Sequence, residues 1–245
     1  MIHPTPEQDG IVEKSNWPTI RSAFRDYETT FVILHPFIKI KPHCEITFAT
    51  GNWPTKDQIV TCTERLTWAE VIKQSELNNI NELDRLLAYL HCARRTADRT
   101  AWIKLSTLLS RNNYVAAEVD YLPAILINSL MDAIKSLGYS HVLEFTAYGE
   151  LRFKHSMEQI CVSKERDFCS LARITTPDKK VLIATDFDQR FSYLSSSRRI
   201  ANYIIEKTGV EGFFCSETTR PDWSYIEQFE NSIDWQSPER YKNYA

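Results

Sequence analysis

The chain has 245 residues, of which 43% are hydrophobic and 12% aromatic, and its formal net charge is −3 at pH 7. This composition is too apolar for a disordered protein, and the length is enough for a domain with its own hydrophobic core. The slight acidity differs from the basic surface of proteins that neutralise phosphate backbones, so we expect no nucleic-acid partner.

The first 60 residues are expected to be irregular and extended, with a short helix near 19–27 and one or two strands. The segment 31–49 (FVILHPFIKIKPHCEITFA) is as apolar as strands are, but it contains Pro36 and Pro42. Proline cannot donate a hydrogen bond to a neighbouring strand. These strands are therefore predicted to be short or to lie at the edge of a sheet.

Helical periodicity begins near residue 66. Thr67 and Glu70 have the spacing of a capping box, which marks the start of a helix, and Asp98 is expected to cap a later helix. Between these caps, four leucines repeat with the spacing of one buried helix face. They are Leu83, Leu86, Leu87 and Leu90.

The most regular predicted helix runs from about 121 to 137 and ends before Gly138. Its apolar positions form a stripe more than four turns long. Leu126 and Leu130 lie on this stripe and are expected to face the core. Asn128 lies off the stripe, so its replacement by alanine is expected to cost little.

Beyond Gly138 the apolar residues alternate, as they do in strands with one buried face. Two hairpins are predicted, which turn at Tyr148-Gly149 and at Pro177-Asp178. A strand at 190–194, a helix at 197–208, a short strand at Gly212–Cys215 and a final helix at 220–233 follow. The sequence therefore predicts a single α+β domain with a helical part at about 66–137, an antiparallel β-meander at about 141–194 and C-terminal helices.

Six cysteines occur, at positions 44, 62, 92, 161, 169 and 215. No two of them have the Cys-x-x-Cys spacing of zinc or redox sites, and we interpret them as buried thiols in a reduced compartment. The N-terminus lacks the features of a secretory signal, and the apolar runs are shorter than the ~20 residues of a membrane span. We therefore expect a cytoplasmic protein without membrane contact.

The motifs of several enzyme classes are missing from the sequence. It contains six glycines, none in a phosphate-binding loop, and neither a G-x-S-x-G elbow nor an H-E-x-x-H zinc helix. We expect no cofactor. His141 and His155 are candidate metal ligands, because the first hairpin would bring them together at its open end. No third ligand is indicated, so ordinary strand histidines are the favoured interpretation.

The densest polar segment is ATDFDQRFSYLSSSRRI at 184–200. Asp186 and Asp188 are either an acid/base or metal-binding pair, or the residues of a turn between strands. Arg198 and Arg199 stand in the first turn of the next helix, where cations oppose the helix dipole. They either bind an anion at the helix start or pair with the two aspartates. We favour the ion pairs.

A second polar segment, GVEGFFCSETTRPDWSY, covers residues 209–225. Glu217 is its candidate catalytic carboxylate, although a solvated loop acid is the favoured interpretation. Residues 185–223 combine an acid-rich turn, F-x-Y-L, a short helix and EGFFC-x-E-T-x-x-x-W. This run resembles the C-terminal signature of an uncharacterised bacterial family of domains of unknown function. The chain also resembles bacterial immunity proteins in general style, and that likeness implies a function in binding.

The sequence predicts a non-catalytic protein that binds another protein, as an immunity protein or antitoxin does. Its aromatic residues supply anchors for such an interface. The alternative is an enzyme for a phosphorylated or carboxylated small molecule. In that enzyme Arg198 and Arg199 would bind the anion, and Asp186 or Asp188 would act as acid or base. The alternatives differ in whether these four residues share a pocket. The sequence does not indicate the oligomeric state.

Overall fold

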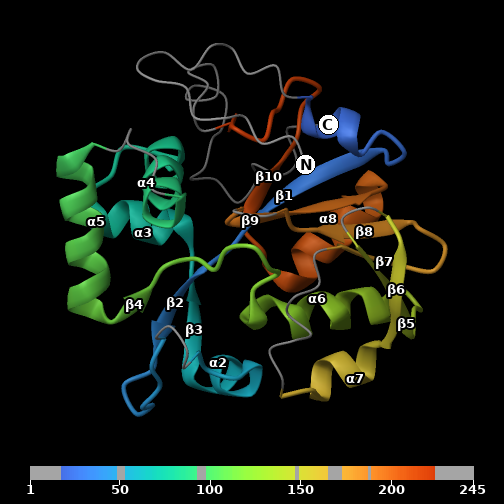
Figure 1. The fold of residues 1–245 in the computed structure, drawn as a ribbon, viewed down its shortest axis with the longest axis horizontal. Coiled ribbons are helices and arrows are strands. Elements are labelled where there is room, and N and C mark those ends of the chain that lie inside the picture. The colour runs from blue at the N-terminus through green and yellow to red at the C-terminus, as the bar shows by residue number, and fades with distance from the viewer. Residues whose placement is uncertain are drawn as a thin grey trace.

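The computed structural model describes residues 18–48, 53–92, 98–146, 149–164, 173–186 and 189–223. These residues form a seven-stranded sheet with the order β10-β1-β9-β8-β7-β5-β6, in which neighbouring strands run antiparallel (Figure 1). The strands are β1 (Thr29–Leu34), β5 (His141–Phe145), β6 (Leu151–Ser156), β7 (Arg173–Thr175), β8 (Val181–Ala184), β9 (Phe191–Ser196) and β10 (Gly212–Phe214).

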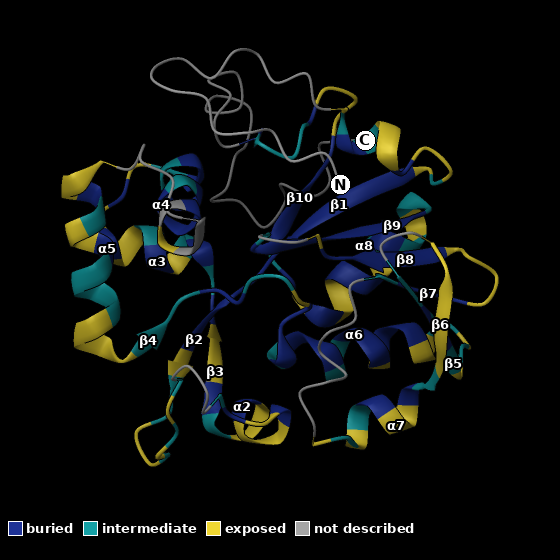
Figure 2. Ribbon diagram, in the orientation of Figure 1, coloured by how far each residue is buried: buried dark blue, intermediate teal, exposed yellow. Residues whose placement is uncertain are grey.

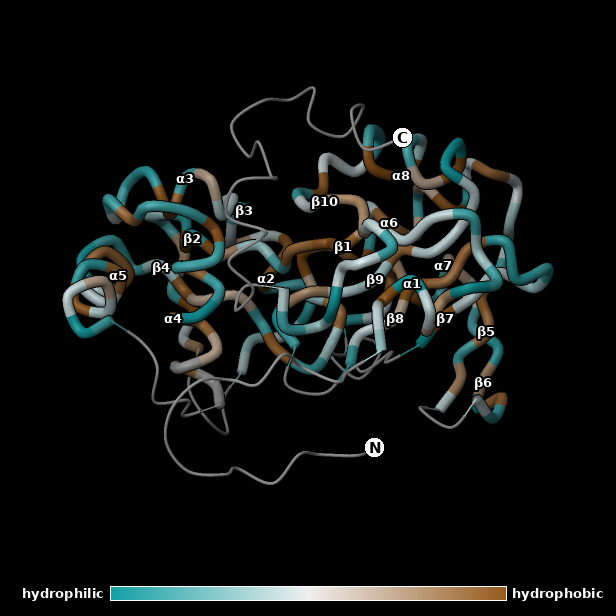
Figure 3. Tube along the Cα trace, turned by 90° about the horizontal axis from the view of Figure 1, so that it is seen from above, coloured by the Kyte–Doolittle hydropathy of each residue, from teal (hydrophilic) through white to brown (hydrophobic). Residues whose placement is uncertain are grey.

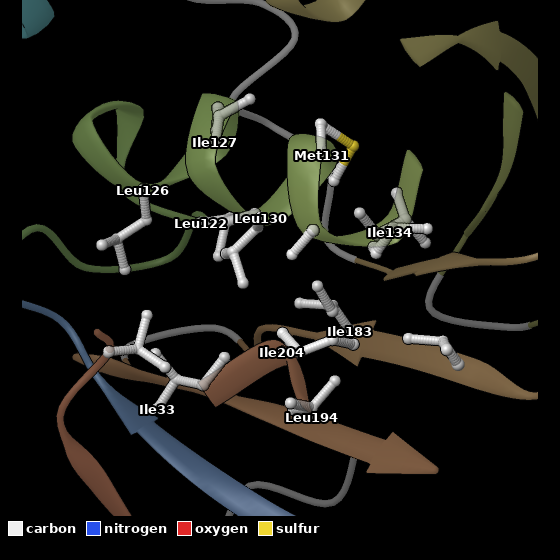
Figure 4. Packing of buried hydrophobic residues seen from close by; sticks show 14 of the residues in the cluster. Ile33, Leu122, Leu126, Ile127, Leu130, Met131, Ile134, Ile183, Leu194 and Ile204 are labelled. Carbon is white, nitrogen blue, oxygen red and sulfur yellow. The ribbon is translucent and has the colours of Figure 1, made fainter. Parts of the chain in front are cut away.

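One face of the seven-stranded sheet is covered by an aliphatic core, which we call the α6 core. Four helices contribute to it: α2 (Lys56–Cys62), α6 (Ala124–Ser136), α7 (Met157–Val162) and α8 (Arg198–Thr208). In Figure 4, Leu126 and Leu130 of α6 point towards Ile33 of β1 and Leu194 of β9. Both leucines are at most 1% exposed, as predicted.

The opposite face of the sheet is covered by a second core, which we call the α4 core. It includes residues of α1 (Ile20–Ala23), α3 (Trp68–Ser75), α4 (Ile80–Cys92) and α5 (Arg99–Asn112). A three-stranded antiparallel sheet with the order β3-β2-β4 adjoins these helices; it contains β2 (Phe37–Ile40), β3 (Thr63–Leu66) and β4 (Tyr114–Val115). Seen from above, α5 and β6 lie at opposite ends of the molecule (Figure 3).

Strand β1 is not an edge strand, contrary to the sequence-based expectation. It lies between β9 and β10, and all six of its residues are buried (Figure 2). Phe31 and Ile33 face the α6 core while Val32 and Leu34 face the α4 core, which explains why the strand reads as a continuous apolar run. Strand β2 is likewise the middle strand of its sheet.

The prolines did not prevent this arrangement because both stand outside the strands. Pro36 lies between β1 and β2, and Pro42 follows β2, so neither removes a donor from a strand pairing. The first 60 residues are also less irregular than expected. Helix α2 begins in them with a capping box of Thr55 and Gln58, which the sequence analysis missed together with the short helix α7.

The predicted helix caps, hairpins and helix end described below are confirmed. Thr67 and Glu70 form the predicted capping box of α3, and the side chain of Asp98 caps α5. Both predicted hairpins form, as β5–β6 and β7–β8. Helix α8 is capped by Ser197 and ends at Gly209, which has a φ of 62°. The predicted helix at 220–233 lies largely outside the described residues.

The structure is therefore a mixed α+β fold. The sequence-based prediction did not include β1, from the N-terminal part, among the strands of the large sheet. Within the described ranges, no helix combines the length and apolar character needed to cross a membrane. Cys44, Cys62, Cys161 and Cys215 are free thiols. Of these four cysteines only Cys215 is buried, so the expectation of buried thiols was wrong for the other three, and Cys169 lies outside the described residues.

Candidate binding groove

The structure separates the carboxylate and the arginines that the sequence analysis combined. Ala184 pairs with Tyr193 and Val181 with Ser196, so Asp186 lies beside the start of β9 whereas Arg198 follows its end. Five residue steps along a strand cover roughly 17 Å. The predicted ion pairs with Asp186 are therefore wrong, and these residues share no pocket. Asp188 lies outside the described residues.

The guanidinium group of Arg198 packs against an aromatic ring. Its guanidinium carbon lies 3.6 Å from the ring centroid of Phe214, a cation–π contact at the margin of the α6 core. Burial lowers the pKa of Arg198, and the nearby Glu28 acts in the opposite direction. Arg199 is exposed. Burial also raises the pKa of Asp186, against the effect of Arg173.

The two candidate metal ligands do not face each other. His141 pairs with Ser156 and His155 with Val142, so the two histidines point to opposite faces of the β5–β6 hairpin. His155 Nε2 lies 2.6 Å from Glu144 Oε2. Across the described residues, no group of three or more His, Cys, Asp or Glu side chains is arranged to hold a metal ion.

Glu217, the remaining candidate, lies on a turn after β10. Its side chain is 86% exposed and its Oε1 atom lies 3.5 Å from Nε of Arg21. No second carboxylate faces it among the described hydrogen bonds and ion pairs. This geometry agrees with the interpretation as a loop acid.

A buried polar chain passes through the centre of the sheet. His35 Nδ1 donates to the carbonyl of Glu118 over 2.7 Å, and the Ser192 hydroxyl therefore donates to His35 Nε2 over 2.8 Å. Thr185 Oγ1 lies 2.7 Å from the Ser192 hydroxyl oxygen. Burial lowers the pKa of His35 to about 3, so its imidazole is neutral. Ser192 and His35 are 0% exposed, which makes this pair a structural element rather than a nucleophile and base.

Next to this chain, a buried ion pair joins α4 to β9. Arg190 contacts both carboxylate oxygens of Asp84, each at 2.5 Å, and the exposed fractions of the two residues are 5% and 1%. The carbonyl of Arg190 also accepts a hydrogen bond from the amide of His35 over 3.0 Å. Sequence reasoning missed this site, because no spacing connects residues 84 and 190.

The best candidate for function is a surface groove of about 460 Å³ beside α5. Its lining comes from α5, from β2 and the loop that follows it, from β4 and from Leu90 of α4. Trp102, Ser106, Leu109 and Asn113 of the α5 segment line it at i, i+4, i+7 and i+11, which is one face of a helix. We call this feature the α5 groove.

The walls of the α5 groove are mainly apolar. Ile46 and Phe48 contribute from the loop after β2, and Leu90 from α4. Leu90 is 40% exposed, so the predicted buried leucine stripe of α4 fails at its last position. Trp102 and Leu109 are only partly buried against the α4 core. Ile103 next to the groove is 54% exposed.

The helix that forms the groove is basic. It carries Arg99, Lys104 and Arg111, all exposed, and no acidic residue. Lys104 Nζ donates to the carbonyl of Glu76 over 3.1 Å, which fixes α5 against the end of α3. Lys104 and Arg111 project from roughly the opposite side of the helix to the groove-lining residues, so the groove itself is apolar with Arg99 as the nearest cation of α5. It contains no pair of titratable groups for acid/base chemistry and is suited to binding.

Comparison with known proteins gives one match. The model of a family described as a protein of unknown function (DUF2711) matches residues 17–225, which include both cores, the buried ion pair and the α5 groove. The resemblance to a family of unknown function is therefore confirmed. None of the curated proteins and none of the solved structures matches the chain.

Proposed function

Because the chain belongs to the DUF2711 family of proteins of unknown function, the family supplies no activity, and we propose from the α5 groove that this protein acts by binding another protein. The groove takes an apolar segment of the partner between α5 and the loop after β2. The observation that supports this function is the group of large apolar side chains left exposed or half-buried around one shallow, open surface depression.

The shape of the groove favours a helical or extended peptide segment over a flat protein face. One wall is a single helix face about three turns long, and the opposite wall is an irregular loop. Amphipathic helices bind in such grooves through side chains spaced at i, i+3 or i+4, and i+7. Trp102 and Leu109 are the anchors on this side, since large rigid side chains at the centre of an interface contribute most binding energy.

The charge of α5 defines the polar part of the partner. Of the three cations of α5, Arg99 is the one near the helix face that carries Trp102 and Leu109, because Lys104 and Arg111 project from roughly the opposite side of the helix. A partner segment with apolar residues on one side and acidic residues beside them would match this pattern and associate faster at low salt. An immunity or antitoxin protein that covers a cytoplasmic enzyme is one form of such a binder.

The enzymatic alternative has weaker support. It requires the arginines of α8 and the aspartates of the β8–β9 turn to act on one small molecule. Asp186 and Arg198 lie beyond opposite ends of β9, too far apart to contact one ligand of that size.

The proposal is tested by photo-crosslinking at the groove in the cells that naturally produce the protein. A photoreactive residue replaces Ser110, an exposed groove residue, and in a control protein it replaces Glu206 on the exposed side of α8. We expect a specific adduct with one protein at position 110 and none at 206. Leu109→Asp should remove the adduct and weaken binding of the purified partner at least about tenfold.

Two results would contradict the proposal. One is an equal set of adducts from both positions, which would indicate random collision. The other is full affinity of the purified partner for the Leu109→Asp protein, with circular dichroism showing that the variant is folded.

A further inference from the structure

Two of the free cysteines lie side by side at the base of the loop that forms one wall of the α5 groove. The pairing of Ile40 with Thr63 between β2 and β3 continues by one step, because the amide of Lys41 donates to the carbonyl of Cys62 over 2.9 Å. A turn then returns the chain, with the amide of Cys44 donating to the carbonyl of Lys41 over 3.0 Å. This turn brings Cys44 back towards Cys62, and the Cys62 thiol is near enough to raise the pKa of the Cys44 thiol.

We propose that Cys44 and Cys62 are a reversible redox-modification site, at which peroxides or small-molecule disulfides oxidise the two thiols to an intramolecular disulfide. With hydrogen peroxide, one thiolate attacks a peroxide oxygen and becomes a sulfenic acid with release of water. The second thiol attacks that sulfur, the S–S bond forms and a second water leaves. The peroxide takes up the two electrons that the thiols lose, and a dithiol reductant reverses the reaction.

The backbone around the pair favours this bond. Disulfides need an S–S distance of about 2.05 Å and cysteines whose α-carbons are close together. Lys41 is the residue paired with Cys62, and the turn from Lys41 to Cys44 brings the second cysteine back towards this pair. Both thiols are partly exposed, so an oxidant in solution reaches them. Cys161, on α7, and Cys215, which is buried after β10, belong to other parts of the fold and serve as internal controls.

The local chemistry sets the pH dependence of the reaction. The hydrogen bond to Cys62 raises the pKa of Cys44, while Lys41 acts weakly in the opposite direction. Because the thiolate is the reactive form, oxidation is slow near neutral pH and accelerates as the pH rises. The pair is therefore a site for sustained oxidation rather than for rapid signalling.

The disulfide also affects the groove, a consequence that rests on the proposed binding function. Ile46 and Phe48 follow Cys44 by two and four residues and form the loop wall. Phe48 packs against Trp53 with ring centroids 5.0 Å apart and planes at 89°. Linking Cys44 to Cys62 fixes the start of this loop, and a wall that is already ordered binds a ligand more tightly.

The modification is tested on the full-length protein with oxidised glutathione, followed by peptide mapping under non-reducing conditions. We expect a crosslinked Cys44–Cys62 peptide as the main product, with a rate that rises from about pH 7 to about pH 9 and with full reversal by dithiothreitol. In Cys62→Ser, Cys44 should instead retain a glutathione adduct. Stable glutathione adducts on both cysteines of the parent, or random crosslinks that include Cys161, would overturn the proposal.

The effect on the groove is measured separately, with the anionic apolar dye anilinonaphthalene sulfonate. The crosslinked parent should bind the dye at least about twofold more tightly than the reduced parent, whereas Cys62→Ser, which forms no crosslink, should show no such tightening after the same treatment and removal of its glutathione adduct. Leu109→Asp identifies the dye signal that arises in the groove. Unchanged dye affinity in the crosslinked protein would overturn the effect on the groove alone, and failure to find a protein partner would not alter the disulfide result.

Discussion

The α6 core and the α4 core cover opposite faces of one sheet, but they are closed to different degrees. Seven of the 13 residues of α6 are buried, and they belong to every turn of that helix. Helix α5 packs at the outer side of the α4 core. Two of its 14 residues, Ala101 and Leu105, are buried (Figure 2). The same kind of apolar stripe therefore stabilises the fold in α6 and leaves a binding surface in α5.

The two cores are joined by polar contacts as well as by the sheet. The Asp84–Arg190 pair links α4 to β9, and Glu211 accepts hydrogen bonds from the amides of Trp68 and Ala69 at the start of α3. Buried polar groups specify geometry more strictly than apolar contacts do, because a shift leaves them without partners. We call the Asp84–Arg190 pair and the contacts of Glu211 the junction. The comparison predicts that the junction is structurally rigid, whereas the α5 groove can change its shape.

The largest effect is expected at this junction. Asp84→Asn removes the negative charge from a pair that is almost completely buried, and should lower the free energy of unfolding by about 3–5 kcal/mol. Urea denaturation measures this change. Glu64→Gln is the matched control, because its pair with Lys39 is 56% and 46% exposed and contributes about 1 kcal/mol or less. Equal losses in both variants would contradict a special role for the junction.

The second test compares one leucine from each core. Leu130→Ala in α6 should lower the free energy of unfolding by about 2–5 kcal/mol, since Leu130 is 0% exposed and its removal leaves a cavity. Leu109→Ala in α5 should cost about 1 kcal/mol or less, because solvent already reaches that side chain. Thermal and urea unfolding give both values. A cost at Leu109 equal to that at Leu130 would show that α5 is as closed as α6.

The third test uses pH on the buried chain at the junction. His35 is neutral when folded, with a pKa of about 3, and it regains an ordinary pKa near 6.5 when unfolded. Below a pH of about 6.5 the unfolded state therefore binds more protons at His35 than the folded state does. The free energy of unfolding is unaffected by this titration above that pH and decreases as the pH falls below it. Protonation of His35 in the unfolded state lowers the free energy of unfolding by about 1.4 kcal/mol for each pH unit.

Glutamine does not titrate, so the His35→Gln variant should lack this pH-dependent loss. The difference in the free energy of unfolding between parent and variant should therefore become smaller from about pH 7 to about pH 5. Urea unfolding at a series of pH values measures the difference. A constant difference across this range would mean that His35 is charged in the folded protein.

The smallest effect is expected at the surface of the sheet. Partial burial acts to raise the pKa of Asp178, but hydrogen bonds from Tyr139, Thr176 and Lys180 hold it at about 2. The stability that this carboxylate provides is present above its ordinary pKa of about 3.9 and is lost as the pH falls towards 2. Asp178→Asn should cost about 1 kcal/mol or less at pH 7, because the side chain is 37% exposed. The cost should vanish near pH 2; a cost that persists there would contradict this account.

Local features were predictable from the sequence because a few neighbouring residues determine them. The cap at Thr67, the end of α8 at Gly209 and the turn at Pro177-Asp178 all follow from hydrogen bonds or backbone preferences within about four residues. Each of these was predicted correctly. The buried face of α6 was predictable as well, since its apolar period is unbroken over the whole helix.

Contacts between distant segments were not predictable. Asn128 lies off the apolar stripe of α6, but its Oδ1 accepts a hydrogen bond from the buried Lys56 ammonium over 3.0 Å, so the expected tolerance to alanine does not hold. The thiols of Cys44 and Cys62 meet without any recognisable spacing. The separation of Asp186 from Arg198 depends on the pairing of β8 with β9, and proximity in sequence suggested the opposite.

The central position of β1 has a consequence for how the chain folds. Its partners, β9 and β10, follow it by about 160 and 180 residues, so the core of the sheet depends on contacts of very high sequence separation. Such topologies fold slowly, because the entropy of closing a long loop must be overcome before the strands stabilise each other. During synthesis the apolar segment TTFVIL leaves the ribosome long before β9 does, and until then it has neither neighbour. The apolar segment of a newly made chain is therefore exposed to other chains during synthesis, and a delay in translation before residue 191 should increase aggregation.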